Sequence, residues 1–375
     1  MRELNMTEAI CLVAGAGIGG GVMVLPYLTV KTGLWSAALI MLIAYAVTVV
    51  LHIMVGELSI RTNYSSELLT VFSKHLFRDG RVLRSAFYIL MAVTLVCNLA
   101  AYITGAGEIL ADLLGIHIMF AEIIFFAAAA IVVLLGLKRV AVNEAIALAV
   151  MLALLAILVV FSLMSHGRLP LAPTRWAPKP LIAVYGMAMF SLSSLFAVPQ
   201  AASGLRGDRR RIRIAVIIGL LINLAVMIVV VLCAQLYSNP VTEVAIIGWA
   251  ASLGGSMRVF GSMFIALAML GTFWSISLQL SDMTKEYLRA GRFSSWLVAT
   301  APSFILALLP LTGFIDLMQM AGGATAVIVA VMVVPAYKNA IRGADGLLLG
   351  APGNSRVLFA VIIAMYLLMA ASSLL

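Results

Sequence analysis

Long apolar runs separated by short polar stretches make up the chain from one end to the other. A helix needs about 20 mostly apolar residues to cross a bilayer, and eleven runs reach or approach that length. They lie near residues 6–29, 34–57, 84–113, 117–137, 140–164, 181–204, 212–236, 255–288, 293–311, 314–337 and 355–374. The pattern predicts an all-α membrane protein with eleven transmembrane helices, forming a single transmembrane domain over residues 1–375.

The composition excludes a soluble globular protein. Hydrophobic residues make up 64% of the chain and charged residues 10%, with a mean hydropathy of +1.15, whereas soluble domains are about half apolar and a quarter charged. The 24 Lys and Arg residues lie in short clusters between the apolar runs, which argues against a nucleic-acid partner. The three cysteines lie inside apolar runs without a CxxC pair, so we expect neither a disulfide framework nor a cofactor.

The basic residues predict the orientation of the chain in the bilayer. Cytoplasmic loops of membrane proteins carry an excess of Lys and Arg. Of the 24 basic residues, 19 lie in one set of alternate loops and 5 in the other. This asymmetry predicts a cytoplasmic N-terminus and, with eleven spans, an external C-terminus. We expect the protein in the plasma membrane, the inner membrane of the cell.

The first apolar run reads AGAGIGGGVMVLPY (Ala14–Tyr27) and is poor in helix-forming residues. Glycine costs about 1 kcal/mol per helical position relative to alanine, and proline about 3 kcal/mol. Two GxxxG pairs in this run are also typical of close helix packing. Packing alone requires glycine on one face, however, and three successive glycines, Gly19, Gly20 and Gly21, cover three directions around the axis. The run therefore predicts an unwound segment within the first span.

The sixth run reads FSLSSLFAVP (Phe190–Pro199) and offers a second place for a break. Serine hydroxyls satisfy backbone groups that a break frees at membrane depth, although serines there are equally typical of helix packing. Spans 1 and 6 each begin a set of five, and a five-span copy is inserted upside down relative to the other. Corresponding breaks in two inverted halves indicate a transporter binding site at the bilayer midplane.

The inverted halves have approximate boundaries in the sequence. The first repeat covers about 6–164 and the second about 181–337, and an extra helix covers about 355–374. A substrate carboxylate would meet the free N–H groups and positive helix end near Gly19 to Gly21. An amino acid or a related anion is therefore the expected cargo.

Four stretches resemble a known family. GGGVMVLPY (Gly19–Tyr27) resembles the first-helix motif of the amino acid/auxin permease group, including its hydroxy and aromatic amino acid permease branch, in the amino acid-polyamine-organocation transporter superfamily. AYITGAGEIL (Ala101–Leu110), GLKRVAVNEAI (Gly136–Ile146) and TFWSISLQLSD (Thr272–Asp282) resemble later parts of that branch, in the same order. The resemblance implies a leucine-transporter-like fold, with five plus five helices in an inverted repeat, one extra helix, and breaks in helices 1 and 6.

The resemblance also implies a set of site residues. The substrate-binding residues would be Gly19, Gly20, Gly21, Tyr102, Phe190, Ser191, Ser193 and Phe196. The equivalent of a common sodium site would use carbonyls of Gly15 and Ile18 with helix-8 groups at Ala268, Gly271 and Thr272. The family often has adjacent hydroxyls in helix 8, and here Gly271 replaces the first of them. Sodium prefers several hard oxygen ligands, so coupling to a proton and coupling to sodium both stay open.

A proton-coupled carrier needs a titratable group, and carboxylates within membrane spans are candidates. Glu108 on the third span and Glu122 on the fourth are the proton-coupling candidates. Helix geometry places Glu108 roughly 36 Å from the inner end of its span, close to the outer surface, which favours an interfacial role for this residue.

Three other buried polar residues have simpler interpretations. Glu57 and Glu144 lie near the cytoplasmic ends of their spans, beside Arg61 and Arg139, and we expect both carboxylates to be ion-paired. His52 lies near the inner end of the second span, where a single histidine is typically a packing residue.

Together these patterns predict a secondary active transporter that moves a neutral amino acid with an apolar or aromatic side chain. Transport would proceed by alternating access, driven by a proton or sodium gradient, with Phe190 as a candidate gate. The alternative is a membrane amino-acid sensor that keeps the carrier fold without transporting. An enzyme is not expected, because no nucleophile and base occur together at membrane depth. The oligomeric state stays open.

Overall fold

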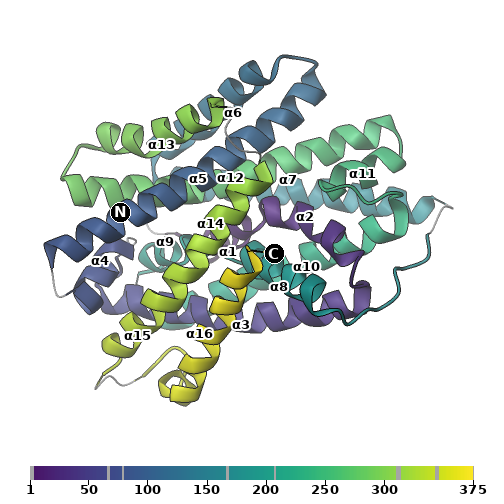
Figure 1. Ribbon diagram of the computed structural model, residues 1–375. Coiled ribbons are helices and arrows are strands. Elements are labelled where there is room, and N and C mark those ends of the chain that lie inside the picture. Colours follow the sequence, from purple (N-terminus) through teal and green to yellow (C-terminus); the bar gives the residue numbers. More distant parts are fainter. Residues whose placement is uncertain are drawn as a thin grey trace.

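The computed structural model describes residues 4–65, 68–77, 80–165, 169–206, 208–309, 314–342 and 346–374, with the backbone alone for 314–316 and 319. All regular secondary structure in these ranges is helical (Figure 1). The α-helices are α1 (Met6–Gly17), α2 (Gly20–Thr29), α3 (Leu34–Arg61), α4 (Leu68–Phe72), α5 (Arg81–Leu114), α6 (Ile118–Leu135), α7 (Leu137–Met164), α8 (Pro178–Ser191), α9 (Ala197–Gly204), α10 (Arg209–Tyr237), α11 (Ala245–Ser252), α12 (Gly255–Leu288), α13 (Arg292–Leu308), α14 (Phe314–Ile328), α15 (Val334–Ala340) and α16 (Arg356–Ser372). Two π-helical turns, η1 (Ser73–Phe77) and η2 (Val329–Val333), and one 3-10 turn, η3 (Ala351–Asn354), complete the set.

The helices follow the predicted apolar runs. Among the described residues, seven helices are long and apolar enough to cross a membrane, or eight if the bent pair α1 and α2 forms one span. Helices α8, α13 and α16 also coincide with predicted spans but contain only 14, 17 and 17 residues. The count of eleven spans therefore stays a prediction.

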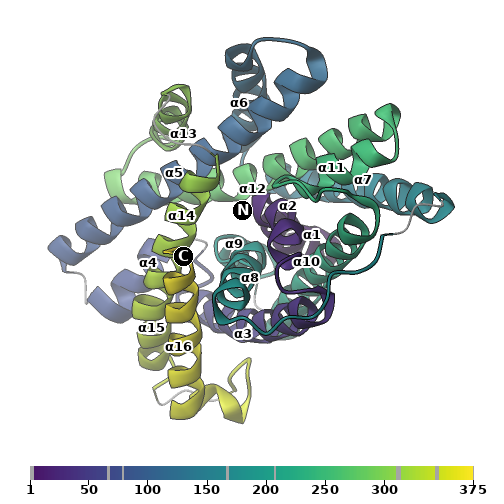
Figure 2. The same ribbon diagram turned by 45° about the vertical axis from the view of Figure 1, so that its right-hand side comes forward.

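Helices α1 and α2 lie in the middle of the bundle (Figures 1 and 2). Helix α1 packs against α7, α9, α10 and α12, and α2 packs against α8 and α10. On one side of the bundle α14 packs against both α5 and α16, and α16 packs against α8. The glycine-rich first run is thus enclosed by helices from both halves of the sequence.

Large apolar side chains cover the outside of the bundle. Ile131 on α6, Leu163 on α7 and Phe293 on α13 are 58%, 60% and 60% exposed. Such side chains are unfavourable in water and favourable against lipid tails. The outer surface therefore has the character of a bilayer-facing protein.

Helices α5 and α12 run antiparallel across the centre of the molecule. At one end the Tyr88 and Thr284 hydroxyls are 3.0 Å apart, and at the other an Arg258 guanidinium nitrogen lies 2.7 Å from the Asp112 carboxylate. These two contacts fix the register of the pair and show which residues of the two helices lie at the same level.

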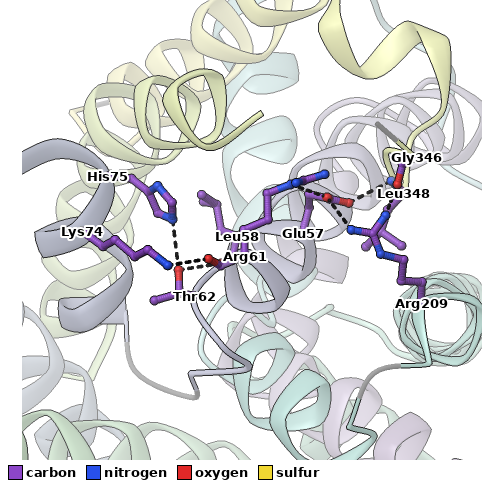
Figure 3. Close-up of polar contacts among 9 residues, drawn as sticks. All are labelled: Glu57, Leu58, Arg61, Thr62, Lys74, His75, Arg209, Gly346 and Leu348. Atoms are coloured by element: carbon purple, nitrogen blue, oxygen red, sulfur yellow. Dashed lines mark hydrogen bonds and ion pairs between the residues drawn. The ribbon is translucent and has the colours of Figure 1, made fainter. Parts of the chain in front are cut away.

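Glu57 is the centre of an ion-pair cluster at one end of the bundle (Figure 3). Its Oε1 lies 2.6 Å from Nε of Arg61 and 3.3 Å from Nη2 of Arg209. Its Oε2 accepts a hydrogen bond of 2.9 Å from the Leu348 N–H, and Arg209 also donates to the Gly346 carbonyl. The predicted ion pairing of Glu57 is confirmed, and it joins α3, α10 and the segment before α16.

A second polar group lies beside this cluster. The Thr62 hydroxyl donates to the Leu58 carbonyl oxygen at 2.8 Å, so Nε2 of His75, 3.1 Å away, donates to Thr62. Burial lowers the pKa of His75, and the charges of Lys74 and Arg61 lower it further. Both effects favour the neutral imidazole, which ties η1 to the end of α3.

Candidate functional site

The polypeptide breaks its helix between Gly17 and Gly20. Helices α1 and α2 meet at an angle of 51°, and the Gly19 N–H donates to the Gly17 carbonyl at 2.9 Å instead of continuing the helical ladder. The first N–H groups of a helix have no intrahelical acceptor. The start of α2 at Gly20 therefore presents free donors and a positive dipole end in the protein interior.

A second interruption separates α8 from α9 between Ser191 and Ala197. The Ser194 N–H donates to Nε2 of His52 at 2.9 Å, and Nδ1 of His52 therefore carries the proton that it donates to the Thr48 carbonyl at 2.7 Å. The Ser194 hydroxyl donates to the Val13 carbonyl at 2.6 Å. His52 is fully buried, and its two hydrogen bonds support the interruption directly.

A cavity lies between the two interruptions. Its walls come from α1, α2, α5, α8, α9, α12 and α14, and the lining residues are Ala16, Gly17, Gly19, Gly21, Asn98, Tyr102, Phe190, Ser191, Ser193, Ser194, Phe196, Ala197, Thr272, Ser275, Ile276 and Thr325. Seven of the eight predicted substrate-binding residues are in this lining. Gly20, the eighth, is buried at the start of α2.

The cavity is contracted in this structure. Its volume is about 30 Å³, well below the roughly 300–1,000 Å³ typical of ligand pockets. An amino acid can therefore occupy it only after the surrounding helices move apart.

Two glycines allow the walls to approach each other so closely. A Cβ on Gly19 would lie 2.7 Å from Oγ1 of Thr272 and 3.0 Å from the Tyr102 hydroxyl. A Cβ on Gly21 would overlap the Ser191 hydroxyl and lie 3.3 Å from the Phe190 ring. Only glycine fits at these two positions in this packing.

The cavity also contains polar atoms that the sequence patterns did not indicate. The Asn98 Oδ1 and Ser275 Oγ are buried and have no hydrogen-bond partner among the described residues. Asn98 lies one turn from Tyr102 on α5, and Ser275 lies one turn from Thr272 on α12. Both are displaced toward the end of the antiparallel α5 and α12 pair at which Tyr88 meets Thr284. Two unsatisfied polar groups therefore lie at one level of the cavity.

Phe190 separates this cavity from a larger one. The second cavity has a volume of about 330 Å³ and is lined by residues of α2, α8, α14, α16 and the turns that follow α2 and α16, with Lys31 and Lys179 among them. Phe190 belongs to both linings, and Cβ atoms on Gly21 and Gly322 would lie 3.3 and 3.0 Å from opposite edges of its ring. The ring is wedged between α2 and α14 as a partition between the two cavities.

Removing the Phe190 ring should connect the cavity between the two helix interruptions with the larger second cavity. In a protein whose three cysteines are replaced by serine, Ser193→Cys supplies a target for a membrane-impermeant thiol reagent. We expect Phe190→Ala to accelerate its labelling about tenfold, equivalent to a barrier lower by about 1.4 kcal/mol. Phe126→Ala is the control, because Phe126 stacks on Phe304 between α6 and α13. Equal labelling rates with and without Phe190 would contradict its role as a partition.

Two of the five residues predicted for a sodium site lie against a side chain from another helix. Gly15 and Gly271 both face the Glu144 carboxylate of α7. The Thr272 hydroxyl donates to the Ala268 carbonyl at 3.2 Å, and the Ile18 N–H bonds to the Ala14 carbonyl at 3.1 Å.

The predicted ion pairing of Glu144 is wrong. The side chain is fully buried, and neither carboxylate oxygen has a hydrogen-bond partner among the described residues. Arg139 precedes Glu144 by five positions, whereas residues three or four apart share a helix face. Helix geometry therefore turns the arginine away from the carboxylate.

Glu108 and Glu122 lie elsewhere in the molecule. They are near the turn between α5 and α6, where the Glu122 side chain packs against Gly107 and interacts electrostatically with Glu108. Neither residue lines the cavity that contains Tyr102 and Phe190. Their role in proton coupling stays a prediction.

Sequence comparison places the chain among known transport proteins. The sequence profile of the tryptophan/tyrosine permease family matches residues 2–372. The "Tyrosine-specific transport system 1" of Haemophilus influenzae is 25% identical over 340 residues, which cover 83% of this chain and 82% of that protein.

Structural comparison finds the same architecture in solved transporters. MhsT in complex with L-phenylalanine superposes with a TM-score of 0.69 at 16% identity, covering 99% of this chain and 100% of that one. MHP1, a nucleobase-cation-symport-1 family transporter in a closed conformation with bromovinylhydantoin bound, gives a TM-score of 0.66 at 12% identity, covering 100% and 91%. At these identities the likeness shows the fold alone, which is that of leucine-transporter-like membrane transporters.

Proposed function

The chain belongs to the tryptophan/tyrosine permease family, and on that premise we propose that it carries tyrosine or tryptophan across the membrane. Family membership makes it an integral multi-pass membrane transporter rather than an enzyme. The narrower placement in the hydroxy and aromatic amino acid permease branch is part of the proposal and is supported by the four motif stretches. The relative that is 25% identical carries a tyrosine-specific name, which supports an aromatic cargo.

The cavity between the two helix interruptions is the observation that carries the proposal. The free N–H groups at the start of α2 suit the substrate carboxylate. Tyr102, Phe190 and Phe196 supply aromatic surface for an aromatic side chain. The partnerless polar atoms of Asn98 and Ser275 suit the phenol of tyrosine or the indole N–H of tryptophan, because a buried polar atom gains most from a ligand that satisfies it.

Transport would proceed by alternating access around the two interruptions. In this proposal residues 6–164 and 181–337 form inverted repeats, residues 355–374 form an extra helix, and the whole chain is one transmembrane unit of eleven spans. The protein would lie in the plasma membrane with its N-terminus in the cytoplasm. A proton or sodium gradient would supply the driving force.

Uptake into proteoliposomes tests the proposal. Purified protein is reconstituted and supplied with radiolabelled L-tyrosine, L-tryptophan or L-leucine, in separate experiments with an inward proton gradient, an inward sodium gradient or no gradient. We expect accumulation of an aromatic amino acid under one of the gradients. Without a gradient, we expect the protein to exchange external labelled amino acid for the same amino acid inside the vesicles. Specific binding without exchange would instead favour a sensor, and the absence of both would refute an aromatic amino acid transporter.

A further inference from the structure

Two polar side chains have no hydrogen-bond partner in the lining of the cavity between the helix interruptions, which is the candidate substrate cavity. Asn98 on α5 is 4% exposed, and Ser275 on α12 is fully buried. Among the described residues, only the Asn98 Oδ1 and the Ser275 Oγ are buried side-chain atoms that belong to this lining and lack a partner. A buried polar atom without a partner is unfavourable, so a ligand that bonds it is stabilised.

Three other hydroxyls of the lining are already engaged. The Ser191 and Thr272 hydroxyls donate to the carbonyls four residues earlier on their own helices, at 2.7 and 3.2 Å, which is common for hydroxyls in helices. The Ser194 hydroxyl donates to the Val13 carbonyl at 2.6 Å. Ser275 differs from them, because its hydroxyl bonds neither its own helix nor a neighbouring one among the described residues. Its proton and its lone pairs are therefore available to a ligand.

Asn98 and Ser275 lie at the same level of the antiparallel α5 and α12 pair. Asn98 is ten residues from Tyr88, and Ser275 is nine residues from Thr284. The hydroxyls of Tyr88 and Thr284 are 3.0 Å apart. At 1.5 Å per residue, Asn98 and Ser275 both lie about 14–15 Å along their helices from this contact. Because both residues also line one cavity, a single ligand group can contact both.

The free N–H groups at the start of α2 lie about one helical turn from this pair. A Cβ on Gly19 would lie 2.7 Å from Oγ1 of Thr272 and 3.0 Å from the Tyr102 hydroxyl, so the start of α2 is level with these two residues. Asn98 is four residues from Tyr102 and Ser275 is three from Thr272, or about 5–6 Å along the helices. A carboxylate at the start of α2 and a ring substituent at Asn98 and Ser275 can therefore belong to one amino acid.

The opposite direction from the start of α2 is filled by Phe190. Cβ atoms on Gly21 and Gly322 would lie 3.3 and 3.0 Å from its ring, so there is no space for a second aromatic ring between α2 and α14. The side chain of a substrate bound through its carboxylate therefore extends toward Asn98 and Ser275.

We propose that Asn98 and Ser275 select the cargo by the polar group on its ring, favouring tyrosine over tryptophan and both over phenylalanine. This inference rests on the proposed function and makes its substrate class more specific. The tyrosine hydroxyl donates to the Asn98 Oδ1 and accepts from the Ser275 hydroxyl, so it satisfies both. The indole N–H of tryptophan only donates, and it satisfies Asn98 alone. Phenylalanine leaves both polar atoms buried without a partner.

Isothermal titration of purified protein with L-tyrosine, L-tryptophan and L-phenylalanine tests this selectivity. We expect wild-type protein to bind tyrosine about 100-fold more tightly than phenylalanine, with tryptophan between them, because a site that bonds a substrate hydroxyl rejects the analogue without it. Asn98→Leu keeps the approximate size of the side chain and should reduce this ratio to less than about fivefold by weakening the binding of tyrosine. Ser275→Ala should weaken tyrosine about tenfold and leave tryptophan unchanged.

Several outcomes would overturn the assignment. These are equal wild-type affinities for tyrosine and phenylalanine, tighter binding of tryptophan than of tyrosine, and a wild-type ratio retained by Asn98→Leu. Wild-type protein that binds and exchanges tyrosine and phenylalanine equally well would refute this inference and leave the proposed function intact. If wild-type protein binds none of the three amino acids, the proposed function fails and this inference fails with it.

Two control variants remove a buried hydroxyl outside the cavity lining. Ser262 is on α12, is 1% exposed, and has an Oγ without a partner among the described residues, as Ser275 does. Thr94 is one turn from Asn98 on α5, and its hydroxyl donates to the Leu90 carbonyl at 2.8 Å. Ser262→Ala and Thr94→Val should keep the wild-type ratio, because neither residue lines the cavity. A loss of selectivity in either variant as large as that in Asn98→Leu would contradict the assignment.

Substrate analogues keep the inference testable in wild-type protein if Asn98→Leu does not fold. 4-Amino-L-phenylalanine has a hydrogen-bond donor at the ring position of the tyrosine hydroxyl, and 4-fluoro-L-phenylalanine has none. We expect the amino analogue to bind within about tenfold of tyrosine and the fluoro analogue to bind as weakly as phenylalanine. Equal affinities for the two analogues would exclude selection by a polar hydrogen on the ring.

Discussion

Replacing Gly19 by leucine is expected to abolish binding of tyrosine and tryptophan, with a loss in affinity of at least about 100-fold, or about 2.7 kcal/mol. The new Cβ would lie 2.7 Å from Oγ1 of Thr272 and 3.0 Å from the Tyr102 hydroxyl. The remaining three carbons would fill the candidate substrate cavity beside the free N–H groups of α2. Isothermal titration of the purified protein with each amino acid measures the effect.

A matched substitution separates the cavity effect from a general cost of leucine. Gly255 is the first residue of α12, and a Cβ there meets no atom within 4 Å. Gly255→Leu should therefore leave affinity and melting temperature close to those of wild-type protein. If Gly19→Leu binds both amino acids as tightly as Gly255→Leu does, the carboxylate site is not at the start of α2.

The positions of the two helix interruptions follow from the helix preferences of the residues at those positions. The sequence therefore predicted both interruptions. Three successive glycines disfavour a helix wherever they occur, and α1 indeed ends at Gly17 with α2 starting at Gly20. Serines followed by proline act similarly between α8 and α9. Because these preferences are local, the two interruptions were predictable from the sequence, whereas seven of the sixteen lining residues were named as substrate-binding residues from the family resemblance.

The environment of Glu144 depends on tertiary packing and was not predictable in the same way. Its neighbours along the sequence include Arg139, which suggested an ion pair. The structure instead places the carboxylate against Gly15 and Gly271, which lie about 130 residues away in opposite directions along the chain. The absence of a side chain at two distant positions makes room for the carboxylate, and no local pattern around Glu144 signals it.

Asn98 and Ser275 were missed for a related reason. Each is one of several polar residues on a long helix, and such residues commonly bond to a neighbouring helix or to their own backbone. Their spacing gave a partial signal, because Asn98 is one turn from Tyr102 and Ser275 is one turn from Thr272. Only the antiparallel register of α5 and α12 brings the two unsatisfied atoms to the same level of one cavity.

Replacing Glu57 by leucine should have the largest effect on stability. The carboxylate is fully buried. It is ion-paired with Arg61 and accepts hydrogen bonds from Arg209 and the Leu348 N–H. Its removal leaves one buried amide and two guanidinium groups, 18% and 37% exposed, without their shared acceptor. Because water reaches part of both guanidinium groups, we expect a cost near the lower end of the range for breaking a buried ion pair, about 3 kcal/mol. Thermal unfolding of the purified protein in detergent, followed by circular dichroism, measures the decrease in melting temperature.

The exposed ion pair of Asp112 and Arg258 provides the control for Glu57→Leu. Both substitutions remove an ion-paired carboxylate, and the expected loss of stability differs because only Glu57 is buried. Both partners are about half exposed, at 50% and 49%, and water solvates whichever charge remains, so Asp112→Leu should cost no more than about 1 kcal/mol. A melting temperature for Glu57→Leu no lower than that of Asp112→Leu would contradict the central role of Glu57. The larger decrease would instead support the role of this carboxylate in joining α3, α10 and the segment before α16, which adds to the direct packing of α3 against α10.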